Sequence, residues 1–251
     1  MLAIVLSGGG AKGAYQAGVW KALRHLKIDY GIVTGTSIGA INGMMMAQNT
    51  YYKCMKLWKN VTFEQLYDDF EYTENVKEIF KNYVDKIIAG GIDTSKIEKI
   101  IVDNYRPNRL YNSGISFGLT SFNLSDKKVV YVTNKNTRPN ILPKYVLASA
   151  TCFPVFKPTK IGVDTYIDGG YSDYIPINLA IELGADEIIA VDLKALGIKK
   201  RIKYKDVKVT YIKPRKKLES FFMFEKNAAR KMINIGFNDT MKTFGKLDGD
   251  I

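Results

Sequence analysis

Short apolar runs alternate with segments of helical periodicity over the first fifty residues. Leu2–Leu6 is an apolar run of strand type that ends at three glycines, and from about Ala14 to Leu26 apolar residues recur at helical intervals. A second run, Tyr30–Thr34, leads into Gly35 and then into a segment of small and Met residues from about Ile38 to Gln48. This alternation of strand and helix predicts an α/β fold with a mostly parallel central sheet and right-handed crossovers.

The remaining pattern is helical first and mixed afterwards. Residues 50 to 110 are amphipathic and rich in aromatic side chains, with an interruption at Gly90 and Gly91, and predict a helical excursion over the sheet. Strands and helices then return, with strands predicted at Ile115–Asn123, Val129–Thr133, Thr165–Ile167, Glu187–Leu193 and Val207–Ile212, and helices at about Pro143–Ala150 and Ala228–Phe244. No internal repeat or linker rich in Pro or Ser is found, so we expect a single domain over residues 1–251.

Composition excludes several classes of protein. The chain has 251 residues, of which 46% are apolar, enough for a buried core, so disorder and collagen are excluded. Two cysteines, Cys54 and Cys152, are too few for the disulfide framework of a small secreted protein. With one histidine they also cannot form the usual Cys/His zinc sites unless carboxylates serve as ligands. No apolar run reaches 18 residues, and Leu2–Leu6 is too short and lacks the basic flank of a signal peptide. We expect a cytoplasmic protein that at most lies on a membrane surface.

The positive charge is concentrated in one stretch. The chain has 37 Lys and Arg against 25 Asp and Glu, a net charge of +12. Between Lys199 and Lys217, ten basic residues accompany one acidic residue, Asp206, so this basic stripe holds +9 of the +12. It runs into the aromatic cluster at 221–224, a combination that suits contact with an anionic membrane. A solvated loop followed by core aromatics is the alternative, and nucleic acid is disfavoured because no nucleic-acid motif accompanies the stripe.

A glycine-rich loop follows the first predicted strand. Gly8-Gly9-Gly10-Ala11-Lys12-Gly13 matches G-x-G-x-x-G between a strand and a helix. A dinucleotide site also needs an acidic residue at the end of the second strand, but Asp29 lies before that strand. The phosphate-binding loop of nucleotide hydrolases is excluded because its G-K-[ST] order is reversed here. What remains is a loop whose N–H groups, beside the positive end of a helix, can hold an anion or a developing oxyanion.

A second glycine-rich turn carries a serine. Gly35-Thr36-Ser37-Ile38-Gly39 fits G-x-S-x-G between a predicted strand and helix, as in a nucleophile elbow. Such a turn exposes the Ser37 hydroxyl, and the N–H of Ile38 stands where an elbow supplies an oxyanion donor. The alternative is a strand-to-helix turn with a serine N-cap. Both loops would emerge at the same carboxyl edge of the sheet, which favours the functional interpretation.

The single histidine restricts the catalytic base. A Ser-Asp-His triad of the α/β-hydrolase type needs a histidine after the serine, whereas His25 precedes Ser37 on the first predicted helix. The base of Ser37 must therefore be Asp, Glu or Lys. Asp168 is the best carboxylate because it follows a predicted strand and precedes Gly169 and Gly170, and its alternative role is that of a turn residue. Asp173 and Asp164 are weaker candidates.

Together these motifs resemble the patatin-like phospholipase family, in which a glycine-rich oxyanion loop, a G-x-S-x-G elbow and a D-G-G/A motif form a Ser-Asp dyad. The resemblance covers residues 2 to 195 and includes Ala148–Phe156, which is similar to the family's A-S-x-A-x-P-x-x-F stretch. Lys12 stands where many members have Arg, so a bidentate contact would be lost. The C-terminal segment, 196–251, is expected to serve packing and membrane contact.

The resemblance implies an α/β fold with helices on both faces of the sheet and hydrolysis of lipid acyl esters without a metal or cofactor. It implies Ser37 as nucleophile, Asp168 as base, and an oxyanion hole in the loop Gly8 to Gly13 with Ile38, its donors being the N–H groups of Gly9 to Ala11. The motif glycines Gly35, Gly39, Gly169 and Gly170 would support the two turns. The 50–110 excursion would help exclude water from the site, and its aromatics could line an acyl groove. The rivals are a nucleotide-dependent enzyme, a lipid-binding membrane module with an inactive dyad, and a nucleic-acid binder.

Overall fold

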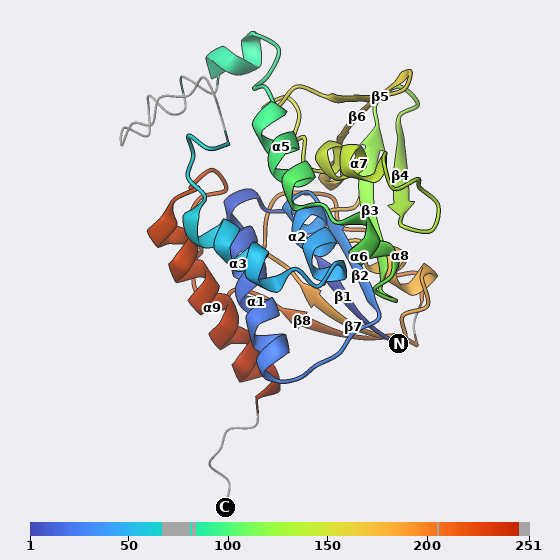
Figure 1. Cartoon of the computed structure of the whole chain (residues 1–251), viewed down its shortest axis with the longest axis vertical. Helices are drawn as coiled ribbons and strands as arrows, with labels where there is room; N and C mark the ends of the chain where they lie inside the picture. The colour runs from blue at the N-terminus through green and yellow to red at the C-terminus, as the bar shows by residue number, and fades with distance from the viewer. Residues whose placement is uncertain (67–80, 82–83, 205, 246–251) are drawn as a thin grey trace, which may run out of the picture.

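The computed structural model describes residues 1–66, 81, 84–204 and 206–245 of the chain (Figure 1). Within these ranges, eight strands form one sheet in the order β5-β6-β3-β2-β1-β7-β8, with β4 paired to β3. Its strands are β1 (Leu2–Leu6), β2 (Ile32–Thr36), β3 (Ser116–Asn123), β4 (Lys128–Thr133), β5 (Thr159–Ile161), β6 (Asp164–Asp168), β7 (Glu187–Val191) and β8 (Lys208–Ile212). β1, β2, β3, β7 and β8 all run parallel, so the predicted mostly parallel α/β sheet is confirmed.

Helices cover both faces of this sheet. They are α1 (Gly13–His25), α2 (Ile38–Ala47), α3 (Tyr51–Asn60), α5 (Ser95–Asn104), α6 (Pro107–Tyr111), α7 (Leu142–Ser149), α8 (Ile177–Glu182) and α9 (Lys226–Phe244), with short 3-10 turns η1 (Gly10–Lys12) and η2 (Gly169–Tyr171). Alternate residues of β1 pack into two hydrophobic cores, one on each face of the sheet, because successive side chains of a strand point to opposite faces. Ile4 and Leu6 pack in the larger core with α1, α2 and α9, whereas Ala3 and Val5 pack with α8. Figure 1 shows α1 and α9 side by side on the larger-core face.

Most predicted elements are present with shifted ends. The second strand runs from Ile32 to Thr36, two residues later at each end than predicted; it ends later because Gly35 and Thr36 remain in the ladder opposite Leu119 and Thr120. The short strand β5 and the helix α8 were not predicted. Where the 50–110 excursion is described it is helical, with a break at Gly90 and Gly91, which both have positive φ; residues 67–80 and 82–83 lie outside the described ranges. Its helices pack mainly on other helices, α3 on α1, α2 and α9, and α5 on α7, so they form an outer layer.

The pairing of β3 brings two strand ends together. β2 runs parallel to β3 and ends with Thr36 opposite Thr120, while β6 runs antiparallel to β3 and ends with Asp168 opposite Ser121. β4 pairs with the same stretch of β3 on its other side, so β2 and β6 share one side of β3 and meet end to end. The residue that follows β2 and the last residue of β6 are therefore adjacent in space.

Candidate active site

Ser37 occupies a strained turn between β2 and α2. Its backbone has φ 59° and ψ −128°, a conformation that is uncommon outside glycine and that persists where the surrounding structure enforces it. Ser37 stands at the N-cap position of α2, as the alternative predicted, but its side chain makes no capping hydrogen bond to the helix. The flanking glycines allow close backbone contact, because a Cβ on Gly39 would lie 2.4 Å from the Leu6 carbonyl oxygen and one on Gly35 2.2 Å from the Gly39 carbonyl oxygen.

A buried serine that the sequence did not single out holds this turn. The Ser37 N–H donates to Oγ of Ser149 at 2.9 Å, and that hydroxyl donates to the Thr120 carbonyl at 2.6 Å. Ser149 is fully buried at the end of α7. It therefore links the elbow to β3, and the only signal for it in the sequence was its place in the stretch Ala148–Phe156.

Asp168 lies beside Ser37, as the end-to-end meeting of β2 and β6 requires. Asp168 is 5% exposed, its carboxylate accepts the Gly170 N–H at 2.7 Å, and the Ser37 side chain is close enough to lower its pKa. Burial raises the pKa of Asp168 to about 6, and Ser37 and Gly170 act in the opposite direction. Gly169 allows the strand end to approach β3, because a Cβ there would lie 2.2 Å from the Thr120 carbonyl oxygen.

The other acidic and basic candidates lie elsewhere. Asp173 is buried and accepts a hydrogen bond from the Tyr131 hydroxyl at 2.9 Å, and burial raises its pKa to about 6 as well. Asp164 stands at the opposite end of β6 from Asp168. His25 is exposed at the far end of α1, roughly 18 Å along the helix axis from the glycine loop. Only Asp168 among these candidates contacts Ser37.

The glycine loop presents fewer N–H groups than its sequence predicts. Within the described part of the chain, the N–H groups of Gly9, Gly10 and Ile38 donate no hydrogen bond to the protein. The other four bond internally: Gly8 to the Tyr174 carbonyl, Ala11 to the Phe221 carbonyl at 2.8 Å, Lys12 to the Gly9 carbonyl, and Gly13 to the Ala11 and Gly10 carbonyls. The expectation that the Ala11 N–H is an available donor is therefore wrong for this conformation, because the segment around Phe221 occupies it.

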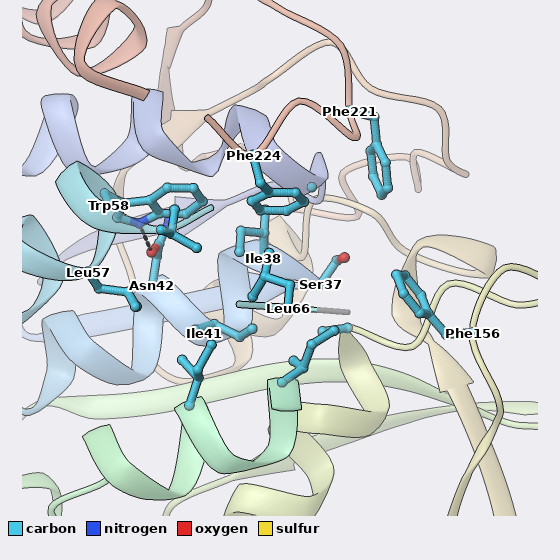
Figure 2. Close-up of a pocket in the computed structure, with 15 residues that line it drawn as sticks. Ser37, Ile38, Ile41, Asn42, Leu57, Trp58, Leu66, Phe156, Phe221 and Phe224 are labelled. Atoms are coloured by element: carbon cyan, nitrogen blue, oxygen red, sulfur yellow. Dashed lines mark hydrogen bonds between the residues drawn. The ribbon is translucent and has the colours of Figure 1, made fainter. Parts of the chain in front are cut away.

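An apolar pocket opens beside Ser37. Its walls come from α2, α3, α5, the Phe156 loop and the aromatic segment before α9, and include Ile41, Leu57, Trp58, Leu66, Ile97, Ile100, Phe156, Phe221 and Phe224 (Figure 2). Figure 2 shows the Ser37 hydroxyl on the side of the pocket where Phe221 and Phe156 lie. The free space is about 70 Å³, several times the roughly 10–15 Å³ that one water needs. Residues 218–224, which we call the aromatic strap, form one wall of this pocket.

Comparison with known proteins identifies the family of the chain. The model of the family described as patatin-like phospholipase matches residues 4–181. The chain belongs to the patatin-like phospholipase family. Lysophospholipase nte1 of Aspergillus terreus is 29% identical over 208 residues, and patatin-like phospholipase domain-containing protein 7 of Rattus norvegicus is 24% identical over 196 residues. These matches cover 77% and 76% of this chain but only 12% and 13% of the relatives, so the chain spans about an eighth of their length.

Two solved structures have a similar fold. VipD from Legionella pneumophila has a TM-score of 0.60 at 14% identity, covering 96% of this chain and 66% of its own. The type III effector protein ExoU has a TM-score of 0.50 at 15% identity, covering 96% of this chain and 52% of its own. At these identities the likeness establishes the patatin-like fold alone.

Behind the family's two glycine motifs, a buried polar network joins three helices. The Asn42 side-chain amide donates to the Gly13 carbonyl at 3.0 Å and to the Gln16 side chain at 2.9 Å, and the Trp58 indole donates to Asn42 at 2.9 Å. Gln16 in turn donates to the Ser7 carbonyl at 2.8 Å. These bonds fix α1, α2 and α3 relative to the strand that precedes the glycine loop, and no motif in the sequence pointed to them.

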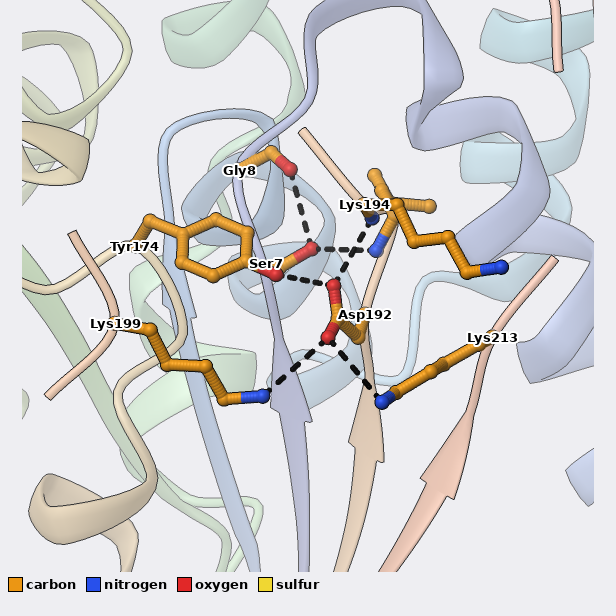
Figure 3. A network of polar contacts seen from close by, with 8 residues as sticks. Ser7, Gly8, Tyr174, Asp192, Lys194, Lys199 and Lys213 are labelled. Atoms are coloured by element: carbon orange, nitrogen blue, oxygen red, sulfur yellow. Dashed lines mark hydrogen bonds and ion pairs between the residues drawn. The ribbon is translucent and has the colours of Figure 1, made fainter. Parts of the chain in front are cut away.

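Several residues of the basic stripe are used inside the protein. Asp192, buried at the end of β7, receives the Lys199 and Lys213 ammonium groups at 3.5 and 3.9 Å together with the Tyr174 hydroxyl (Figure 3). Lys200 donates to the Tyr131 hydroxyl. Lys208 pairs with Glu187 at 2.8 Å, and Arg215 lies 4.0 Å from Asp239. The stripe is therefore not uniformly free for a partner, contrary to the simplest interpretation of its sequence.

Neither a cluster of metal-binding side chains nor a membrane-spanning helix is present in the described ranges. They contain no group of three His, Cys, Asp or Glu side chains placed to hold a metal ion, and both cysteines are free thiols. None of the helices in these ranges is long and apolar enough to cross a bilayer.

Proposed function

We propose that this chain is a serine acyl hydrolase that cleaves carboxylic esters of phospholipids or other lipids, with Ser37 as nucleophile and Asp168 as base. The observation that carries the proposal is the strained elbow serine next to a buried carboxylate, beside an apolar pocket, in a chain of the patatin-like phospholipase family. With the only histidine exposed at the far end of α1, the proton of Ser37 goes to Asp168.

The chemistry proceeds by acyl transfer in two steps. Asp168 accepts the hydroxyl proton as the Ser37 oxygen attacks the ester carbonyl, and the tetrahedral oxyanion is stabilised by the free N–H groups of Gly9, Gly10 and Ile38. Asp168 returns the proton to the departing alcohol, and a water molecule, deprotonated by the same carboxylate, then releases the fatty acid from Ser37. Because the first step needs the ionised carboxylate, hydrolysis rises with pH through about 6, the pKa of Asp168.

We also propose that the substrate is taken from an anionic membrane surface. The pocket lining is apolar, as an acyl chain requires, and the molecule carries a basic stripe from Lys199 to Lys217. No cofactor or nucleic acid is assigned a part in this function.

The first experiment compares carboxylate and serine variants with a matched control. Wild type, Ser37→Ala, Asp168→Asn and Asp173→Asn are treated with a fluorophosphonate probe and assayed on a short-chain nitrophenyl ester. Asp173→Asn is the control because it makes the same change in a buried aspartate that does not contact Ser37. We expect Ser37→Ala and Asp168→Asn to lose labelling and at least about a thousandfold in hydrolysis, and Asp173→Asn to keep both.

Two results would overturn parts of this assignment. Labelling that persists in Ser37→Ala removes Ser37 as nucleophile. A folded wild-type protein, checked by circular dichroism, that neither labels nor hydrolyses esters supports the alternative of an inactive lipid-binding, membrane-associated module.

A further inference from the structure

A buried carboxylate that the proposed chemistry does not use stands beside the glycine loop. Asp192 is 5% exposed and directly follows β7, whose last residue, Val191, pairs with Leu6 of β1. The glycine loop begins two residues after Leu6. Because β1 and β7 are parallel neighbours, their carboxyl ends lie side by side, about 5 Å apart. Asp192 therefore lies at the base of the loop that carries the free N–H groups of Gly9 and Gly10.

The two carboxylate oxygens of Asp192 have different partners (Figure 3). Oδ1 accepts the Lys194 N–H at 3.0 Å and also the Tyr174 hydroxyl. Oδ2 faces the ammonium groups of Lys199 and Lys213 at 3.5 and 3.9 Å. The two lysines balance the negative charge, whereas the hydrogen bonds at Oδ1 tie two other segments of the chain to the end of β7.

The bond to Tyr174 leads to one side of the glycine loop. The Gly8 N–H donates to the Tyr174 carbonyl at 3.0 Å. The residue whose hydroxyl is held by Asp192 therefore also holds the first residue of the loop through its backbone. Tyr174 is itself buried, so its hydroxyl has no water to replace the carboxylate as a partner.

The bond to Lys194 leads to the other side of the loop. It closes a turn around Leu193, in which Lys194 has a φ of 51°, a value uncommon outside glycine. From this turn the Leu193 N–H donates to Oγ of Ser7 at 2.9 Å, and that hydroxyl donates to the Gly8 carbonyl at 3.1 Å. Both polar groups of the Gly8 backbone are thus connected to Asp192.

From these contacts we infer that Asp192 is a positioning residue of the oxyanion hole. Its hydrogen bonds fix Gly8 and thereby orient the free N–H groups of Gly9 and Gly10 toward the developing oxyanion. The Leu193 side chain supports the same orientation, because a Cβ on Gly9 would lie 2.6 Å from its Cδ1. Misdirected donors weaken the transition state more than the bound substrate, so the effect falls on kcat. This inference rests on the proposed function and adds a residue that acts through the loop.

The test uses three variants and a short-chain nitrophenyl ester. Asp192→Ala removes both hydrogen bonds, Tyr174→Phe removes only the hydroxyl, and Asp192→Asn keeps an oxygen that can accept both. We expect kcat to fall about tenfold to a hundredfold in Asp192→Ala and about threefold to tenfold in Tyr174→Phe, with KM within twofold of wild type. Asp192→Asn should recover most of the loss. An Asp192→Asn protein as slow as Asp192→Ala would overturn the inference.

The matched control is a second cluster of tyrosine, aspartate and lysine. Asp173 is 1% exposed and accepts the Tyr131 hydroxyl at 2.9 Å, and Lys200 donates to the same hydroxyl. In the part of the chain that the structure describes, neither the Asp173 nor the Tyr131 side chain hydrogen-bonds to the glycine loop. Asp173→Ala and Tyr131→Phe make the same chemical changes and should keep kcat within twofold, with circular dichroism as the check that each variant is folded.

Two ketones separate the oxyanion hole from a general loss of order. In a hexyl trifluoromethyl ketone, the Ser37 oxygen adds to the carbonyl carbon, the hydroxyl proton passes to Asp168, and the carbonyl oxygen becomes an oxyanion. Hexyl methyl ketone fills the same pocket without this addition. We expect the inhibition constant of the first ketone to rise in Asp192→Ala and Tyr174→Phe by about the factor that kcat falls, and that of the second to stay within twofold. Equal weakening of both ketones, or an equal loss of kcat in the controls, would overturn the inference.

Failure of the hydrolase assignment is measured separately. If wild type neither labels nor hydrolyses esters, the proposed function fails, and hydrogen exchange of the Gly8 N–H, followed by NMR, tests the positioning without activity. Faster exchange in Asp192→Ala and Tyr174→Phe than in Asp173→Ala and Tyr131→Phe supports the role of Asp192. Equal exchange in the two pairs removes it.

Discussion

Burial gives Asp168 both its reactivity and a cost in stability. An ordinary aspartate is too weak a base for a hydroxyl near neutral pH, and removal from water strengthens it by raising its pKa from 3.8 to about 6. In the unfolded chain the same carboxyl keeps its ordinary value. Below pH about 4 both states are protonated; between about 4 and 6 only the folded state keeps the proton; above 6 both are ionised. Stability therefore falls as pH rises through this window.

The Asp168→Asn variant should be more stable than wild type above pH 6. The shift of about two pKa units corresponds to about 3 kcal/mol, an upper value because the amide also changes the contact with Ser37. The amide oxygen can still accept the Gly170 N–H, so the turn at η2 is preserved. Urea unfolding at pH 8 should show the gain, and at pH 4.5 it should shrink. The same difference at both pH values would mean that ionisation of Asp168 is not its cause.

At the scale of elements, α9 holds the helix that carries the glycine loop. α1 and α9 contact each other through glycines, because a Cβ on Gly18 would lie 2.0 Å from the Ile233 carbonyl oxygen and one on Gly236 2.1 Å from the Tyr15 carbonyl oxygen. The Tyr15 hydroxyl adds a hydrogen bond to Asp239 at 3.1 Å. The C-terminal segment, whose sequence pattern is the least distinctive, thus fixes the element that begins at the active site.

Gly236→Ala should destabilise the protein although it improves helix propensity. Alanine favours an exposed helix position by about 1 kcal/mol over glycine, whereas overpacking here should cost about 1–3 kcal/mol net, because both contacting groups are backbone. Asn234→Ala, at an exposed position on the same helix, should be neutral or slightly stabilising. Thermal unfolding of the two variants measures the difference, and equal melting temperatures would contradict the close contact.

The sequence predicted the parallel sheet and the two glycine-rich turns because each depends on local pattern. Asp168 was chosen as the partner of Ser37 from its place after a predicted strand and from the family resemblance, and this pairing stays a prediction. The sequence could not predict contacts between distant segments. The Phe221 carbonyl accepts the Ala11 N–H although 210 positions of sequence separate the two residues. Ser149, on α7, accepts the N–H of Ser37. Which lysines of the basic stripe are paired likewise depends on Asp192 and Glu187, residues outside the stripe. The strand β5 has three residues, too few for periodicity to register.

At the scale of the whole molecule, several exposed apolar side chains lie near the turn that follows Asp168. Leu196 is fully exposed and Ile198 is 57% exposed, and the Ile198 N–H donates to the Gly170 carbonyl at 2.9 Å, two residues from Asp168. Tyr171 and Phe153 are also exposed, and they are joined by a hydrogen bond from the Tyr171 hydroxyl to the Phe153 carbonyl. This apolar rim continues directly into the basic stripe, an arrangement suited to an anionic bilayer.

Leu196→Asp should therefore weaken binding to vesicles that contain phosphatidylserine. Burial of a fully exposed leucine in the bilayer contributes about 1.5–3 kcal/mol, so its loss, together with an added negative charge, should lower the partition coefficient roughly tenfold or more. Tyr52→Asp makes the same charge change at an 81% exposed residue that lies beyond the opposite end of α2 from Ser37, and should have little effect. Vesicle sedimentation measures both, and raised salt should weaken wild-type binding because the basic stripe contributes through screened charges. Equal binding of the two variants would place the membrane-facing surface elsewhere on the molecule.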